Sequence, residues 1–140
     1  MRGKCSWFGG PDDKGVNESE TLALYPRRLA RSLEPDEFYC AIRMLYNVIP
    51  GMTVEEGKQI YRDHLQVKVT NLKNARTVLC KIVDWGPDTR TGRTIDLSPG
   101  AMKALGVRTD DEVEIELVAR PWVKIHTRQD GQTIEILGEK

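Results

Sequence analysis

The sequence predicts a mainly β domain that closes, or nearly closes, into a barrel, with one short helix before the last barrel strand. Two observations support this prediction. Several short segments alternate apolar and polar residues with the period of a half-buried strand, and turn-forming residues separate them. A barrel suits many short strands because closure leaves no exposed strand edge.

Length and charge limit the classes of protein to which the chain can belong. Its 140 residues are enough for one core, so residues 1–140 are predicted to form a single domain. Lysine plus arginine and aspartate plus glutamate number 21 each and are scattered, so no nucleic-acid partner is expected. The chain contains no apolar stretch of signal-peptide or transmembrane length. We therefore expect a soluble protein that is cytoplasmic or phage-delivered, or periplasmic or extracellular if a leader was removed.

The cysteines and histidines indicate neither a disulfide framework nor a metal site. Cys5, Cys40 and Cys80 are odd in number, and each lies in an apolar or alternating stretch, which is typical of small buried side chains. His64 and His126 do not lie at metal-ligand spacing from a cysteine or from each other. We predict no metal and no cofactor.

The first third of the chain is predicted to begin with a strand and continue into an insertion. Residues 4–8 form the strand, and a glycine-proline-aspartate cluster at residues 9–13 ends it. The insertion covers roughly residues 11–65. Within it, residues 26–33 are predicted to form a short helix with Pro26 in its first turn.

Two further elements are predicted at the end of the insertion. Residues 38–48 are rich in apolar and aromatic residues and are predicted to form a strand buried on both faces. Residues 53–64 are predicted to form a helix. Thr53 and Glu56 have the spacing of a capping box at its start.

From residue 66 onward the pattern has the period of a β-strand. Residues 66–70 and 78–84 alternate on either side of a polar turn at residues 71–74, which predicts a hairpin. The second strand of this hairpin leads into a turn that contains Gly86 and Pro87. The sharp turn places Asp84 at the end of a strand that the pattern predicts to be buried.

The last third is predicted to contain a capped helix, a strand and a second hairpin. Ser98 is the expected N-cap, with Pro99 at the first helical position and Gly106 just beyond the end. Apolar residues at positions 113, 115 and 117 alternate with glutamates, so one face of that strand is predicted to lie in the core and the other to face solvent. Residues 121–140 are predicted to form a hairpin around an Asp-Gly turn.

Two motifs resemble a known family. Residues 83–87 (Val-Asp-Trp-Gly-Pro) and residues 92–98 (Gly-Arg-Thr-Ile-Asp-Leu-Ser) occur in order with the hairpin, the short helix and the following strand. Together they resemble the double-psi β-barrel domain of rare lipoprotein A, which also occurs in expansins and in one endoglucanase family. Ser6-Trp7-Phe8-Gly9 resembles its opening strand. The resemblance implies a six-stranded double-psi β-barrel with helical insertions in the N-terminal half.

The resemblance also implies peptidoglycan as the partner. Members similar to rare lipoprotein A include lytic transglycosylases, which cleave the glycan strand and form an anhydro sugar, whereas expansins loosen wall polymers without hydrolysis. The family's cleavage aspartate falls on Asp84, and the aspartate of the expansin motif falls on Asp96. Tyr25 stands where a histidine associated with cleavage is found. The family's early glutamate has no clear counterpart, and the candidates by position are Asp12, Asp13, Glu18 and Glu20.

Two readings are open for each candidate carboxylate. A glycan-cleaving acid must hold its proton near neutral pH, which apolar neighbours such as Trp85 favour at Asp84. Alternatively, Asp84 accepts backbone hydrogen bonds in the turn that follows it. Asp96 either lines a groove or has a structural role before the helix, with Arg93 as its partner.

The aromatic residues and the overall function also have alternatives. Trp7, Tyr25 and Trp85 form a platform for a sugar ring, or they serve in packing. The chain is a peptidoglycan-cleaving enzyme, a non-catalytic wall-binding or expansin-like module, or a structural protein such as a virion component with protein assembly partners. The fold alone does not choose among these classes, because one fold hosts unrelated functions.

Overall fold

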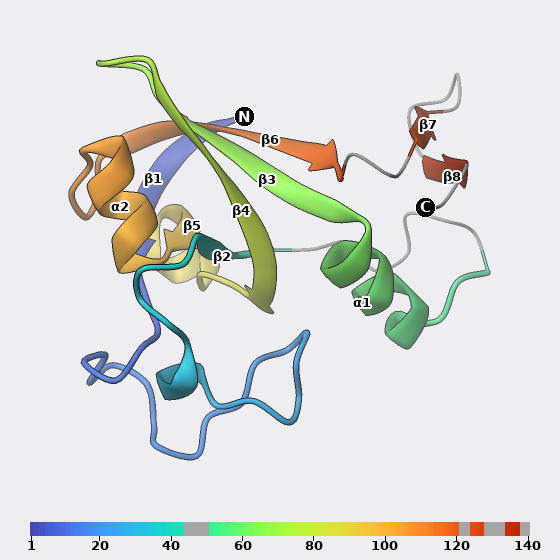
Figure 1. Cartoon of the computed structure of the whole chain (residues 1–140), viewed down its shortest axis with the longest axis horizontal. Helices are drawn as coiled ribbons and strands as arrows, with labels where there is room; N and C mark the ends of the chain where they lie inside the picture. The colour runs from blue at the N-terminus through green and yellow to red at the C-terminus, as the bar shows by residue number, and fades with distance from the viewer. Residues whose placement is uncertain (44–50, 121–123, 128–133, 138–140) are drawn as a thin grey trace.

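Six strands form a closed barrel in the order β1-β5-β2-β4-β3-β6 (Figure 1). This computed structural model describes residues 1–43, 51–120, 124–127 and 134–137. The pairs β1-β5 and β2-β4 are parallel, and the other neighbouring pairs are antiparallel, an order compatible with a double-psi barrel. The barrel strands are β1 (Arg2–Trp7), β2 (Tyr39–Ile42), β3 (Leu65–Asn71), β4 (Arg76–Trp85), β5 (Arg93–Leu97) and β6 (Glu112–Ala119).

The hairpin of β3 and β4 is confirmed where the alternating pattern predicted it. Val67 lies opposite Cys80 and Val69 lies opposite Val78, so the apolar side chains of both strands face the barrel interior. On its other edge, β3 pairs with β6, and β6 pairs with β1. These two pairings close the barrel.

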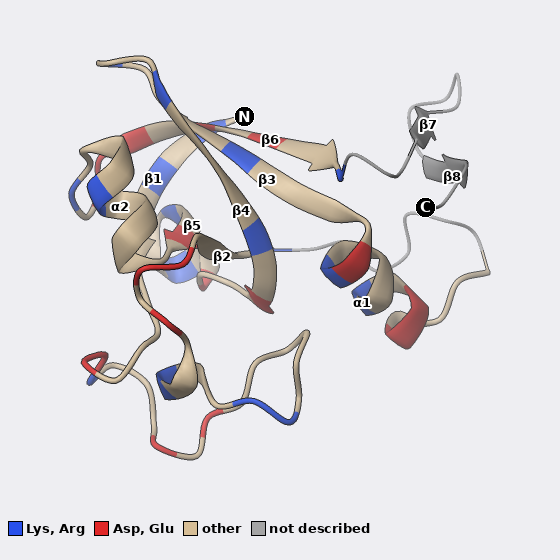
Figure 2. Cartoon of the chain, viewed as in Figure 1, with Lys and Arg blue, Asp and Glu red and all other residues tan. Residues whose placement is uncertain are grey.

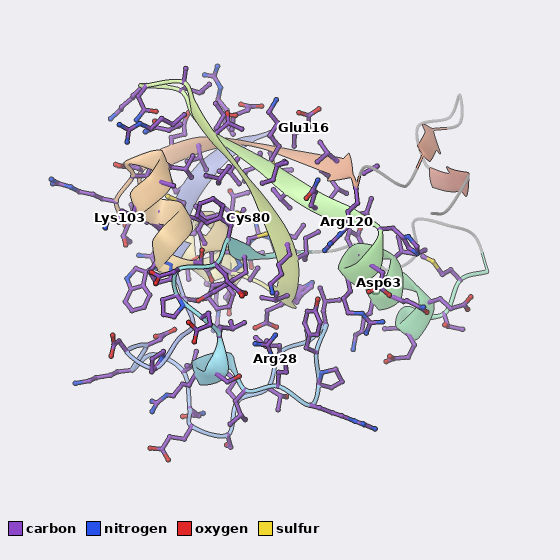
Figure 3. The ribbon with its side chains drawn as sticks, in the orientation of Figure 1. Arg28, Asp63, Cys80, Lys103, Glu116 and Arg120 are labelled. Carbon is purple, nitrogen blue, oxygen red and sulfur yellow. The ribbon has the colours of Figure 1, made fainter. Side chains whose placement is uncertain are left out.

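The barrel interior contains all three cysteines. Cys5, Cys40 and Cys80 are each 0% exposed, as the apolar stretches around them predicted, and Cys80 is labelled on β4 in Figure 3. Burial raises the pKa of Cys5 to about 11, raises that of Cys80 to about 12 and places that of Cys40 well above its ordinary value. The thiols are therefore protonated at neutral pH, and they pack as small apolar groups.

Two α-helices flank the barrel, and both begin as the sequence predicted. Helix α1 (Val54–Asp63) has Thr53 as its N-cap in a complete capping box with Glu56. Helix α2 (Pro99–Leu105) follows β5 directly, and the Ser98 hydroxyl accepts the N–H of Ala101. Helix α2 ends at Gly106, whose φ of 71° lies in the left-handed region.

The prediction of a helix at residues 26–33 is wrong. Only a single 3₁₀ turn, η1 (Ala30–Ser32), is present there. The backbone of this region bonds to distant chain instead, since the N–H of Leu24 donates to the carbonyl of Val83 at the end of β4. The local helix preference is overridden because the apolar side chains gain more free energy by packing against the barrel.

Residues 8–38, here termed the covering segment, lie over one outer side of the barrel (Figure 1). They pack there with outward-facing residues of β2 and β4 to form a second core, separate from the barrel interior. The Tyr39 hydroxyl donates a hydrogen bond of 2.7 Å to the carbonyl of Phe8 within it. The second core consists of Phe8, Leu22, Ala30, Leu33, Tyr39, Ala41 and Val83.

The remaining predicted elements fall partly outside the described residues. Strand β2 covers the first part of the predicted strand, and its residues Tyr39–Ala41 are all buried, while residues 44–50 lie outside the description. Strands β7 (Lys124–Thr127) and β8 (Ile134–Leu137) pair antiparallel, and the predicted turn between them is also outside it. In the described part of the chain, neither helix has the length and apolarity required to cross a membrane.

Candidate functional site

Two aspartates predicted from the motifs lie on either side of one strand. Ala41 of β2 lies opposite Asp84 of β4 on one edge and opposite Asp96 of β5 on the other. Two strand spacings separate the α-carbons of the aspartates by about 10 Å. We term Asp84 and Asp96 the carboxylate row. Figure 2 shows acidic residues at the end of β4 and along the chain that leads into β2.

The second core lies directly beneath the carboxylate row. Ala41, between the two aspartates, is 2% exposed, and Val83, which precedes Asp84, is 0% exposed. The β2-β4 register shifts at this point, which is the mark of a β-bulge. The bulge places Val83 in the second core while Asp84 stays opposite Ala41. Both carboxylates are thus half-buried against apolar side chains.

Of the two carboxyl groups, that of Asp96 has the pKa that departs further from its ordinary value. Burial raises its pKa from 3.8 to about 6, against the opposing charge of Arg93 and with further raising by the charges of Asp13 and Asp84. No hydrogen bond or ion pair to the Asp96 carboxylate is present among the described residues. Asp96 therefore holds its proton into the weakly acidic range with no protein donor attached.

The Asp84 carboxylate, unlike that of Asp96, accepts hydrogen bonds from the backbone of the described residues. Its Oδ1 accepts the backbone N–H groups of Ala23 and Trp85, each at 2.9 Å. Burial raises the pKa of Asp84, and these two hydrogen bonds oppose that rise. Both readings from the sequence thus describe part of its environment, because Asp84 is desolvated and also fixes the backbone at the end of β4.

Asp13, one of the positional candidates, organises the turn after β1. It is 8% exposed, and its carboxylate accepts the N–H groups of Gly9 at 2.7 Å and Gly15 at 2.9 Å. Gly9 has a φ of 80°, and a Cβ there would lie 2.7 Å from the Tyr39 hydroxyl oxygen, so only glycine fits. The charge of Asp13 acts on Asp96 from this fixed position.

Arg93 does not pair with Asp96. Its guanidinium binds Asp110, with 2.9 Å between Arg93 Nε and Asp110 Oδ1. Arg93 therefore reaches Asp96 only through its charge, which lowers the pKa of that carboxyl.

Tyr25 lies close in the fold to the end of β4. The neighbouring residues Ala23 and Leu24 both donate backbone hydrogen bonds there, to Asp84 and Val83. The Tyr25 ring has the guanidinium carbons of Arg28 and Arg62 at 5.9 Å each from its centroid. Figure 3 shows Arg28 below the end of β4.

The other predicted aromatic candidates differ in position. The Trp85 side chain follows Asp84 and is 48% exposed. Trp7 is 41% exposed and, with Asp12, lines a cavity of about 450 Å³. This cavity contains neither Asp84 nor Asp96, so Asp12 and Trp7 are separate from the carboxylate row.

Some structural features around the candidate site were not predicted from the sequence. Ala41, which separates the two aspartates, carries no chemical signal, and its place depends on strand pairings between distant segments. Arg108, which lines the same cavity as Trp7, follows a helix end and has no motif around it. Among the described residues, no group of three or more histidines, cysteines, aspartates or glutamates is arranged to hold a metal ion.

Comparison of the sequence with known proteins identifies relatives of this chain. No protein-family model matches the chain. It is 34% identical over 118 residues to the probable endolytic peptidoglycan transglycosylase RlpA of Aquifex aeolicus, covering 83% of this chain and 39% of that protein. Proteins of the same name from Synechocystis and Nostoc are 52% identical over 44 residues and 55% identical over 42 residues.

These two shorter matches cover 31% and 30% of this chain and 13% and 11% of the relatives. The chain thus spans well under half of the length of the relatives that it matches. The closed barrel and these similarities define its class as a six-stranded β-barrel domain of the kind found within larger proteins. More particularly, the chain is related to rare lipoprotein A and has an RlpA-like barrel, which confirms the resemblance expected from the sequence.

Proposed function

We propose that this domain acts on peptidoglycan as a lytic transglycosylase whose reaction centre is the carboxylate row. The names of the three relatives support the choice of substrate. The main support for this reaction comes from the environment of the Asp96 carboxyl. This group is half-buried, has a pKa of about 6 and lies one strand away from a second carboxylate. A general acid works best when its pKa lies near the working pH.

The reaction needs one proton donor and one negative charge. Protonated Asp96 donates its proton to the glycosidic oxygen while the bond from that oxygen to C1 of the sugar breaks. Ionised Asp84 stabilises the positive charge that develops at C1. The C6 hydroxyl of the same sugar then attacks C1, and its proton passes to the Asp96 carboxylate. The anhydro sugar forms without consumption of water, and Asp96 regains its proton.

The two aspartates are assigned by their environments. From the motif alone, Asp84 was the expected acid. However, the hydrogen bonds from Ala23 and Trp85 favour its ionised form, whereas Asp96 receives none from the described residues and has its pKa raised to about 6. Two neighbouring carboxyl groups whose environments separate their pKa values are typical of an acid and an electrostatic partner. We therefore place the proton on Asp96.

The purified chain is expected to release muropeptides that end in a 1,6-anhydro sugar when it is incubated with peptidoglycan sacculi near pH 6. Mass spectrometry of the soluble products measures this release. Asp88→Asn serves as a control, because Asp88 is exposed, binds Arg90 and lies outside the carboxylate row, so this variant should match the wild type.

Other products would point to the other functions considered. Muropeptides with reducing ends would identify a hydrolase and contradict the transglycosylase. Binding to sacculi with no released sugar would favour a wall-binding or expansin-like module, the alternative suggested by Tyr25 at the histidine position. Neither binding nor release would favour a structural protein with assembly partners.

A further inference from the structure

The Tyr25 side chain contacts three parts of the fold at once. Its ring packs against the barrel interior and also against the second core. The guanidinium carbon of Arg28, from the covering segment, and that of Arg62, from helix α1, each lie 5.9 Å from the ring centroid. A guanidinium at this distance from an aromatic ring is attracted to it. Tyr25 therefore connects the covering segment to the barrel and to α1.

The guanidinium that α1 contributes is fixed in place. Arg62 Nε donates to Asp63 Oδ1 at 3.0 Å, and Arg62 Nη2 donates to Asp63 Oδ2 at 3.1 Å, which makes a bidentate pair. The carbonyl of Arg62 accepts a hydrogen bond of 3.0 Å from the guanidinium of Arg120, the residue after β6. Asp63 and Arg120 are both labelled beside α1 in Figure 3. The Tyr25 ring thus rests on a guanidinium that is anchored to the end of a helix.

Residues 22–28, here termed the Tyr25 loop, are closed by their own backbone hydrogen bonds. The N–H of Leu22 donates to the carbonyl of Arg28 at 3.1 Å, and the N–H of Tyr25 donates to the carbonyl of Leu22 at 3.2 Å. The N–H of Arg28 donates to the carbonyl of Tyr25 at 2.9 Å. Because the loop is closed in this way, a contact at the Tyr25 ring fixes the position of the whole loop.

The Tyr25 loop supplies two hydrogen bonds to the end of β4. The N–H of Ala23 donates to Asp84 Oδ1 at 2.9 Å, and the N–H of Leu24 donates to the carbonyl of Val83 at 3.2 Å. The other hydrogen bond to the Asp84 carboxylate within the described residues comes from Trp85, which belongs to β4 itself. The bond from Ala23 is therefore the one that depends on where the loop lies.

We infer that Tyr25 is a positioning residue for the carboxylate row. Its ring, held between Arg28 and Arg62, keeps the Tyr25 loop against β4. The Ala23 N–H consequently stays on the Asp84 carboxylate. The Tyr25 hydroxyl makes no hydrogen bond with the described residues, so the ring is the part that acts. The importance of this contact for cleavage rests on the proposed function, whereas the contact itself does not.

Hydrogen exchange of the Ala23 and Leu24 amides, followed by NMR on the full chain, measures how firmly the Tyr25 loop is held. Tyr25→Ala removes the ring and should reduce the protection of both amides by at least about tenfold. Tyr25→Phe keeps the ring and should retain the protection. Arg62→Gln should reduce it about two- to fivefold, the size of one such contact at an exposed site. Arg27→Gln is the matched control, because Arg27 is exposed in the same loop and is not one of the guanidinium groups over the ring, so it should match the wild type.

The amides of β3 separate a local effect from global unfolding. They belong to the barrel and should keep their protection in every variant. Unchanged protection of Ala23 in both Tyr25→Ala and Arg62→Gln would overturn the inference. A loss that is equally large in β3 would also overturn it, because Tyr25 would then stabilise the fold as a whole.

The release of anhydro-muropeptides tests the link to the reaction. The rate should fall in Tyr25→Ala and Arg62→Gln in the order of their lost protection, and Tyr25→Phe should restore the wild-type rate. An inactive Tyr25→Phe with full protection of Ala23 would overturn the positioning role, because the hydroxyl would then take part in the chemistry. Absence of release by the wild type would contradict the proposed function, while the exchange data would still decide whether Tyr25 holds the loop.

Discussion

Asp96→Asn is expected to reduce the release of anhydro-muropeptides from sacculi by at least about 100-fold, because an amide cannot donate the proton that the glycosidic oxygen needs. The variant keeps the size and shape of the side chain. It breaks no hydrogen bond with the described residues, since the Asp96 carboxylate makes none with them. A loss of activity would therefore reflect the lost proton and not a lost fold. Circular dichroism and the initial rate of product release measure the two separately.

Asp84→Asn is the informative comparison. The asparagine oxygen still accepts the N–H groups of Ala23 and Trp85, so the end of β4 should keep its conformation. Loss of the negative charge should slow the reaction less than Asp96→Asn does. It should also lower the pKa of Asp96 and shift the rate profile to lower pH, since the charge of Asp84 raises that pKa. Full activity of Asp96→Asn with none left in Asp84→Asn would reverse the two assigned roles.

Asp96→Asn is also expected to stabilise the fold at neutral pH. The folded pKa of about 6 lies above the ordinary value of 3.8, so the folded state binds a proton that the unfolded state has released between these pH values. Stability contributed by this group is therefore complete below pH 3.8 and is lost as the pH rises through 6. The full pKa shift corresponds to about 3 kcal/mol of unfolding free energy. Because solvent reaches this half-buried group, we expect a gain of about 1 to 3 kcal/mol for the variant.

Urea unfolding at pH 7.5 and at pH 4 measures this effect. The variant should exceed the wild type in free energy of unfolding at pH 7.5 and approach it at pH 4. Asp110→Asn gives the opposite control, because the Arg93 guanidinium lowers the pKa of Asp110 and its removal should destabilise the fold at pH 7.5. A gain for Asp96→Asn of the same size at both pH values would show that protonation is not its cause.

The barrel strands were predictable because their periodicity is local. Val67 and Val69 alternate with polar residues, and so do Val78 and Cys80, so the pattern alone indicates which side chains face the interior. The helix after Ser98 was equally clear from its N-cap, its proline and its terminal glycine. These signals depend on neighbouring residues and need no knowledge of the tertiary fold.

The covering segment was not predictable in the same way. Its backbone conformation is fixed by distant partners, such as the hydrogen bonds from Ala23 to Asp84 and from Leu24 to Val83. Pro26 and the leucines around it gave a local helix signal, which the second core overrides. Only the positions of β2 and β4 determine where these leucines become buried.

The sequence named the aspartates of the proposed site, but it did not predict their arrangement. The two motifs named Asp84 and Asp96, but their shared neighbour Ala41 depends on the register of β2 with both β4 and β5. Such register between distant strands has no local signal. For the same reason, the sequence suggested Asp84 as the acid, whereas burial and the opposing backbone hydrogen bonds favour Asp96 for that role.

In the proposed mechanism, Asp96 holds the reactive proton beside an ionised Asp84. An NMR titration of the side-chain carboxyl carbons, with both aspartates assigned through their asparagine variants, tests it most directly. We expect Asp96 to titrate near pH 6 and Asp84 to titrate at lower pH. An Asp96 midpoint near the ordinary 3.8, or an Asp84 midpoint above that of Asp96, would contradict it.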